Sequence, residues 1–109
     1  MIIKKEIEKR SYAVKFSVED EGKTVGTVRL YIMYNEVHTE PFGFLEYVLV
    51  DENYRGKGLG KKLVDSVIEE AKKLGCYKLI LTCSNKELYG WYKSFGFEER
   101  GSGFRMNFK

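Results

Sequence analysis

The sequence predicts a mixed α/β (α+β) fold with a central mixed sheet and two main helices. Residues 12–18 alternate in polarity and residues 24–34 are β-branched and aromatic, which predicts an antiparallel hairpin. A long apolar segment, 42–50, runs through a glycine-rich loop into a helical apolar period over 59–74. A short apolar segment, 77–83, follows, so a strand, a crossover helix and a second strand should pair in parallel.

Composition favours one folded domain over residues 1–109. Hydrophobic residues make up 43% of the chain and aromatic residues 15%, which excludes a disordered chain. The net charge of +3 is modest, but residues 51–109 carry 12 basic and 8 acidic groups, against 7 and 8 in residues 1–50. The positive excess begins at the glycine-rich loop and suits a small polyanion at least as well as a nucleic acid.

Cysteine use and the absence of targeting signals predict a cytoplasmic protein. Cys76 and Cys83 have no metal-type spacing, so we expect buried free thiols and no metal site. Charged residues follow Met1-Ile2-Ile3 directly, unlike the start of a signal peptide. No apolar run approaches the ~20 residues of a membrane span, so no membrane association is expected.

The front half of the chain is expected to be antiparallel. Glu21-Gly22-Lys23 is a turn signal between the two hairpin strands, and residues 2–8 predict a short edge strand. The segment 42–50 is apolar on both faces except at Glu46. Such a pattern predicts a central strand that is covered on both sides.

The back half is expected to hold two helices and a closing hairpin. The helix over 59–74 should end at Gly75, a C-cap glycine. The segment from Ser84 to Glu87 matches a capping box, with Ser84 as N-cap of a second helix that stops at Gly96. Residues 97–108 predict a β-hairpin that turns at a glycine-serine-glycine sequence.

The loop before the first helix carries the clearest chemical signal, and it reads Arg55-Gly56-Lys57-Gly58-Leu59-Gly60-Lys61-Lys62. Glycines at every second position let a ligand approach the backbone. The amides and dipole of a helix N-terminus favour an anion, whereas basic side chains there oppose the dipole unless an anion is bound. The loop therefore predicts a phosphate-binding site. The alternative is a glycine-rich turn with solvated lysines.

Spacing excludes two better-known phosphate motifs. A Walker A loop needs a glycine where Arg55 stands, and serine or threonine where Lys62 stands. A dinucleotide-binding fingerprint needs a third glycine at Lys61 and normally follows the first strand of a larger sheet. Neither motif fits this loop.

Two segments together resemble the GNAT (Gcn5-related) N-acetyltransferase family in its short form. The family signature Arg/Gln-x-x-Gly-x-Gly/Ala is met by Arg55, Gly58 and Gly60. Downstream, Asn85 and the run Trp91-Tyr92-Lys93-Ser94-Phe95-Gly96-Phe97 are similar to the family's Asn…Phe-Tyr-x-x-x-Gly-Phe segment. The resemblance implies the GNAT acyl-CoA N-acyltransferase fold, whose central sheet splays to leave a gap for the thioester.

The front half departs from that family pattern. No helical period precedes Leu59, so the N-terminal helices that often wall the acceptor site are missing. This implies an open site, or one that a second subunit completes in a homodimer. Residues 51–84 and 96–108 are similar to the glucosamine-6-phosphate N-acetyltransferase subfamily. That subfamily typically has two adjacent carboxylates on the strand before the loop, whereas this chain has Glu46 followed by Tyr47.

The resemblance implies acetyl-CoA as the donor. The residues expected to hold its pyrophosphate lie in the loop and are Arg55, Gly56, Lys57, Gly58, Leu59, Gly60 and Lys61. In the family the pantetheine arm pairs with the strand before the loop, here Val48, Leu49 and Val50, like an added strand. Asn85 is a further candidate to hydrogen-bond this arm, or it is a neighbour of a helix cap.

Acetyl transfer to an amine needs a base, a stabilised oxyanion and an acid for the departing thiolate. Glu46 is the one carboxylate inside the apolar strand, and we expect it to accept the amine proton through a water molecule. The alternative is an exposed surface glutamate. The resemblance implies Tyr92 as the general acid. Its alternative is core packing, because Leu88, Tyr92 and Phe95 form a helical stripe.

Three functions remain open from the sequence. The first is acetylation of a small primary amine, such as an amino sugar or a polyamine. The second is acetylation of a protein or peptide amine, for which the missing front helices would leave room. The third is a non-catalytic CoA-binding module or an RNA-binding module, since aromatic and basic residues interleave over 89–93. No basic patch extends over a strand face, so nucleic acid is the least supported partner.

Overall fold

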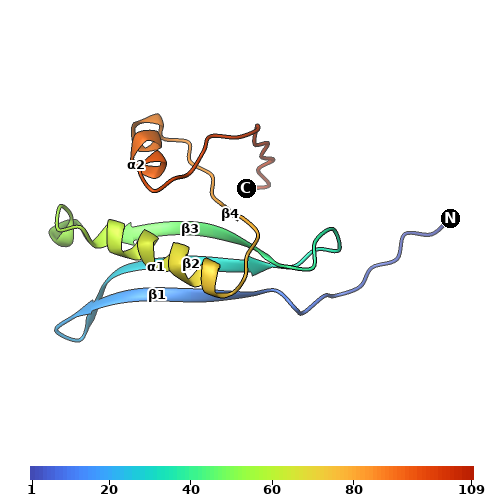
Figure 1. The fold of residues 1–109 in the computed structure, drawn as a ribbon, viewed down its shortest axis with the longest axis horizontal. Helices are drawn as coiled ribbons and strands as arrows, with labels where there is room; N and C mark the ends of the chain where they lie inside the picture. Colours follow the sequence, from blue (N-terminus) through green and yellow to red (C-terminus); the bar gives the residue numbers. More distant parts are fainter.

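The computed structural model describes residues 1–109 in full. Its elements are β1 (Tyr12–Asp20), β2 (Lys23–Met33), β3 (Phe42–Val50), the 3-10 turn η1 (Glu52–Tyr54), α1 (Leu59–Lys73), β4 (Leu79–Ile80), the 3-10 turn η2 (Lys86–Leu88) and α2 (Tyr89–Lys93). The sheet order is β1-β2-β3-β4, with β4 parallel to β3 and the other pairs antiparallel. Figure 1 shows α1 lying along the sheet and α2 set apart near the carboxyl end. The mixed α/β fold with two helices is confirmed, and no α-helix precedes α1 in this chain.

The β1–β2 hairpin forms as its alternating pattern predicts. Asp20 pairs with Lys23, so the turn consists of Glu21 and Gly22, with φ angles of 51° and 76°. Positive φ at both central residues gives a turn whose twist matches that of the flanking strands. Val14, Phe16 and Val18 of β1 are half-buried against the core, while their neighbours along the strand are exposed.

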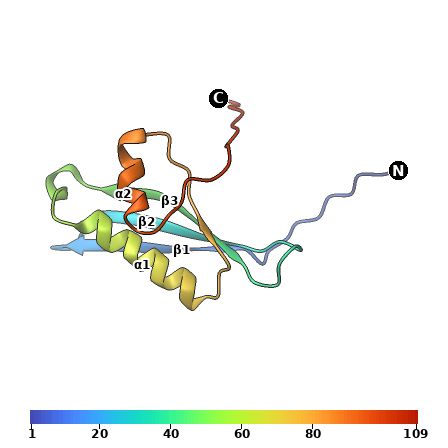
Figure 2. The same ribbon diagram turned by 45° about the horizontal axis from the view of Figure 1, so that its top comes forward.

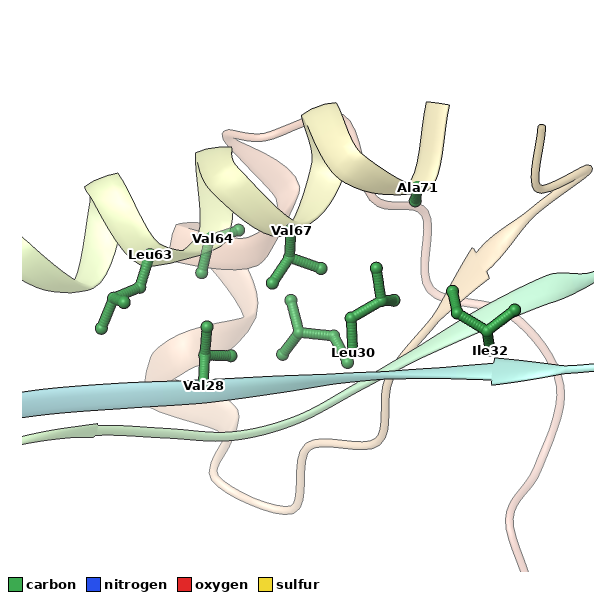
Figure 3. Packing of buried hydrophobic residues seen from close by; sticks show 8 residues of the cluster. Val28, Leu30, Ile32, Leu63, Val64, Val67 and Ala71 are labelled. Atoms are coloured by element: carbon green, nitrogen blue, oxygen red, sulfur yellow. The ribbon is translucent and has the colours of Figure 1, made fainter. Parts of the chain in front are cut away.

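The core lies between α1 and one face of the sheet (Figure 3). Its cluster of eight buried residues consists of Val28, Leu30, Ile32, Leu45, Leu63, Val64, Val67 and Ala71. The second face has no such cover, since Tyr47 and Leu49 of β3 are 63% and 57% exposed. The expectation that β3 is covered on both sides is therefore wrong. The reason is that the helices lie on one side of this part of the strand (Figure 2).

Glycines define both ends of α1. Gly58 is the N-cap with a φ of 80°, and Gly75 follows the helix with a φ of 78°. The Gly75 amide donates to the Lys72 carbonyl at 3.1 Å, and the Cys76 amide donates to the Ala71 carbonyl at 3.0 Å. These two bonds make a Schellman motif, which satisfies carbonyls that the helix end would otherwise leave free. The predicted end of the helix at Gly75 is confirmed.

The segment 77–83 forms less strand than expected. Only Leu79–Ile80 is a strand, because β4 pairs with β3 at just two positions, Gly43 and Phe44. Beyond them β3 diverges, so the rest of the segment has no ladder to join. The second helix is also shorter than expected. The 3-10 turn η2 precedes α2, and Asn85, not Ser84, is the N-cap of that turn, since the Asn85 Oδ1 accepts a hydrogen bond from the Glu87 amide at 3.0 Å.

The two ends of the chain do not form the strands expected at 2–8 and 97–108. Both segments are exposed almost throughout, including Phe104, Met106 and Phe108. An isolated hairpin is marginal in water unless it pairs with a sheet or packs on a helix. Neither segment reaches a sheet edge in this structure. No helix of the chain combines the length and apolarity that crossing a bilayer requires.

Candidate active site

A β-bulge in the middle of β3 creates the site. Thr27 of β2 opposes Leu49, whereas Arg29 opposes Glu46, so β3 contains one residue more than β2 between these pairs. Tyr47 lies inside the bulge with a φ of 57°, the left-handed region that side chains other than glycine seldom occupy. A bulge bends its strand and leaves one residue out of the ladder. Here it turns β3 away from β4.

The sheet is open on the far side of that bulge. β4 pairs only with Gly43 and Phe44, where the Gly43 amide donates to the Lys78 carbonyl at 2.9 Å. From Leu45 onward β3 has no neighbouring strand on this side. A cavity of about 230 Å³ lies at the opening, lined by Leu45, Glu46, Tyr47, Leu81, Thr82 and Tyr92. The splayed sheet that the family resemblance implied is therefore present.

The structure brings Glu46 and Tyr92 into this one cavity. Glu46 reaches it from β3 and Tyr92 from α2, and both side chains are half-buried. The ring of Tyr92 packs edge-on against Trp91, with centroids 5.0 Å apart, and against Phe97 at 6.1 Å. These aromatic contacts fix the ring, while the hydroxyl has no hydrogen-bond partner within the chain. Tyr92 thus combines a ring held by aromatic neighbours with a polar group at the cavity.

Burial raises the pKa of Tyr92 above its usual value, and the neighbouring Cys83 adds to the rise. A raised pKa keeps the phenol protonated at neutral pH, as a proton donor requires.

In an alkaline titration followed by phenolate absorbance, we expect Tyr92 to ionise at a higher pH than an exposed tyrosine. Tyr92→Phe should then remove a late-titrating phenol from the curve. Loss of an early-titrating phenol instead would contradict the assignment.

The glycines of the loop divide into two kinds. Gly56 and Gly58 have φ angles of 78° and 80°, and nothing lies within 4 Å of a side chain added at either position. They therefore give the backbone its left-handed turns and leave space beside it. A side chain on Gly60 would instead meet Trp91, with its Cβ 3.6 Å from the Trp91 Cζ2. Gly60 serves the packing of α2 against α1 and does not face open space as the other two do.

The start of α1 offers unpaired amides to an anion. No side chain caps it, no acidic residue lies in its first turn, and the amide of Lys62 is the one that bonds back to Gly58. The amides of Leu59, Gly60 and Lys61 thus have no helical acceptor. These groups, at the positive end of the helix dipole, fit a pyrophosphate.

The basic side chains of the loop are held in different ways. The Arg55 Nε donates to the Val50 carbonyl at 3.1 Å, which ties the loop to the end of β3. The Lys61 Nζ lies 2.8 Å from the Asp65 carboxylate, so this side chain is directed along the helix. Lys57 projects from the loop, with its Nζ 5.1 Å from the centre of the Tyr54 ring. Among the three, Lys57 is the one without an acidic or carbonyl partner.

The remaining residues expected to bind the donor are Val48 to Val50 of β3 and Asn85. Val48 and Val50 pack half-buried against the core, while Leu49 faces solvent. Their backbone edge on the β4 side has no strand beside it, as an added extended ligand would require. Asn85 caps the turn before α2 through its Oδ1, so one part of its amide already has a structural role.

Comparison with known proteins gives the family of this chain. Residues 2–97 match the family described as Acetyltransferase (GNAT) family. The chain belongs to the GNAT acetyltransferase family. Membership explains why the loop, the open sheet and the aromatic segment of α2 occur together in so short a chain.

Named GNAT relatives include sugar-phosphate acetyltransferases. A glucosamine 6-phosphate N-acetyltransferase of Trypanosoma brucei brucei is 36% identical over 93 residues, which are 84% of this chain and 63% of the relative. A probable glucosamine 6-phosphate N-acetyltransferase of Drosophila melanogaster is 41% identical over 83 residues, 73% of this chain and 37% of the relative. The chain therefore spans less than two thirds of the length of these relatives.

A solved structure agrees with the sequence matches. Glucosamine-6-phosphate N-acetyltransferase from Arabidopsis thaliana superposes with a TM-score of 0.82 at 32% identity, covering 89% of this chain and 67% of that one. The GNAT fold predicted from the loop and the aromatic segment is confirmed.

Sequence reasoning missed four contributors to the site of this GNAT chain. Tyr47 occupies the bulge, and Leu45, Leu81 and Thr82 line the cavity. No glycine or asparagine marks the bulge, because the local sequence is Leu-Glu-Tyr-Val. Leu81 and Thr82 fell within a segment that reads as an ordinary strand. Their place in the cavity follows from the divergence of two strands, which no local pattern reports.

Proposed function

We propose that this chain transfers the acetyl group of acetyl-CoA to a primary amine. The observation that carries the proposal is the meeting of Glu46 and Tyr92 in one cavity, at the point where β3 and β4 part. The anion-binding loop begins at the end of the same strand, β3. Glu46 of β3, Tyr92 of α2 and the glycine loop that follows β3 are thus grouped along the open edge of one strand.

The donor would lie along the open edge of β3. The free amides at the start of α1 and the Lys57 side chain would hold its pyrophosphate. The backbone from Val48 to Val50 would bond the extended amide-bearing arm as a strand bonds a neighbour. Acetyl-CoA supplies the thioester, whose acetyl end would then reach the cavity at the bulge.

The residues of the cavity account for each proton in the transfer. Glu46 would accept, through a water molecule, a proton from the attacking amine. The amine nitrogen forms a bond to the acetyl carbon as the carbon–sulfur bond breaks, and Tyr92 gives its hydroxyl proton to the departing thiolate. The bulge leaves a backbone group out of the ladder beside the cavity, where an amide can stabilise negative charge on the carbonyl oxygen.

An amino sugar phosphate is the acceptor that the relatives favour, since several carry that substrate in their names. A second candidate is a peptide amine. It is supported by the exposed second face of β3, where Tyr47 and Leu49 leave the surroundings of the cavity open. A second copy of the chain that completed the site would close this face and favour the small acceptor.

Calorimetry with acetyl-CoA, followed by a thiol-release assay on a panel of amines, tests the proposal. The panel should contain glucosamine 6-phosphate, a polyamine and short peptides with free amino groups. We expect acetyl-CoA binding that weakens as salt rises, and turnover with at least one amine. No binding at millimolar acetyl-CoA would refute the proposal. Binding without turnover on any amine would leave a CoA-binding module.

A further inference from the structure

The glycine loop is tied to a distant part of the sheet. The Tyr54 hydroxyl, in η1, donates to the Asp20 Oδ2 at 2.6 Å, across 34 residues of sequence. A second contact joins the same two regions, since the Lys23 Nζ lies 3.6 Å from the Asp51 Oδ2. Asp20 and Lys23 face each other at the tip of the β1–β2 hairpin. The hairpin tip is therefore a support for the start of the loop.

The ring of Tyr54 connects this support to the loop cation. The Lys57 Nζ stands 5.1 Å from the ring centre, within the range of a cation–π interaction. The hydrogen bond to Asp20 raises the pKa of Tyr54, so the phenol remains a donor at neutral pH. Lys57 lies between Gly56 and Gly58, two glycines in the left-handed conformation. Its position therefore depends on what its side chain touches.

We propose that Tyr54 is a positioning residue for the donor: its hydroxyl anchors to Asp20 and its ring holds the Lys57 ammonium where the anionic end of the donor binds. This inference rests on the proposed function, which supplies the donor. If the Lys57 side chain is already ordered before the donor binds, less side-chain conformational entropy is lost on binding. The effect should fall on affinity for the phosphate-bearing part of the ligand.

A role in folding alone does not account for these contacts. The turn η1 contains no buried residue, and Tyr54 is not part of the hydrophobic core. Its side-chain contacts lead to a carboxylate on the hairpin and to a lysine of the loop. Removing the ring should therefore leave the core intact and change what the loop can bind.

A double-mutant cycle with two ligands tests the proposal. CoA, and pantetheine as a probe without phosphates, would be titrated calorimetrically into the full chain and into Tyr54→Leu, Lys57→Met and the double variant. We expect each single variant to weaken CoA binding about fivefold. The double variant should be little weaker than either, since the two residues act together. Pantetheine affinity should stay within about twofold in all of them, as should CoA affinity in the control Tyr12→Leu.

Several outcomes would overturn the inference. Multiplicative losses in the double variant, or equal losses for pantetheine and CoA, would show that Tyr54 acts independently of Lys57 or through the fold. If Tyr54→Leu fails to fold by circular dichroism, Tyr54→Phe and Asp20→Ala each remove the anchoring bond and keep the ring. Unchanged CoA affinity in both would also overturn it. Absence of CoA binding by the unmodified chain would instead refute the proposed function itself.

Discussion

Replacing Tyr92 by phenylalanine should lower kcat for acetyl transfer about 100-fold, the size of effect that loss of a general acid typically causes. The ring contacts with Trp91 and Phe97 would persist, because only a hydroxyl without an internal hydrogen-bond partner is removed. The free energy of unfolding should therefore change by less than about 0.5 kcal/mol. Steady-state kinetics with saturating acetyl-CoA and a turned-over amine, beside urea denaturation, measures both quantities.

Tyr89→Phe is the matched control, since Tyr89 also lies on α2 but does not line the cavity. It should retain the kcat of the unmodified chain. A mutation that removes only an interaction of the transition state lowers kcat and kcat/KM equally. Turnover by Tyr92→Phe at the unmodified rate would exclude the acid role and leave Tyr92 as a core residue.

Replacing Leu30 by alanine should lower the free energy of unfolding by about 3 kcal/mol. The Leu30 side chain is fully buried, and it lies between β2 and the inner face of α1 (Figure 3). Truncation there loses apolar burial and leaves a cavity that the helix cannot fully close. Chemical denaturation followed by circular dichroism measures the change, provided that both proteins unfold in one transition.

Leu49→Ala makes the same chemical change at a position that is 57% exposed. Its cost should be under about 1 kcal/mol, because much of that side chain is already in water. Equal losses at the two positions would mean that the face of β3 opposite α1 is covered in solution. That result would also place a partner or another segment over Leu49.

Local signals were enough for most of the front half and for α1. The alternation over 12–18, the Glu21-Gly22 turn and the apolar stripe of the helix each predict one element within a short window. Gly75 ends α1 because a left-handed residue is needed there, and glycine adopts that conformation without strain. Each of these features depends on neighbours only a few residues away.

Non-local features could not be predicted in the same way. The segment 77–83 has the composition of a strand, yet the length of β4 is set by how far β3 stays beside it. The position of Tyr47 in a left-handed conformation ends that pairing, and tyrosine gives no signal for a bulge. The N-cap of η2 is Asn85 and not the predicted Ser84. Both residue types cap well, and the local backbone decides between them.

The candidate site shows the same division. The loop could be recognised from its glycines and cations alone. Only the family resemblance predicts that Glu46 and Tyr92 share one site. Nothing in their spacing places a residue of the strand beside a helix residue so far along the chain. The Tyr54–Asp20 bond had no signal at all, because a tyrosine and an aspartate at loop edges are common.

The two-residue pairing of β3 with β4 has a consequence for cooperativity. The antiparallel strands share long ladders, whereas the segment after α1 pairs with the sheet only at Gly43 and Phe44, beside one further backbone bond from the Tyr77 amide to the Pro41 carbonyl. Amide hydrogens of the carboxyl-terminal third should therefore exchange with solvent through local opening, well before the whole domain unfolds. A donor bound between β3 and β4 would bridge the two strands. Its binding energy would suppress that opening, so that the chain becomes a single cooperative unit only while it holds its substrate.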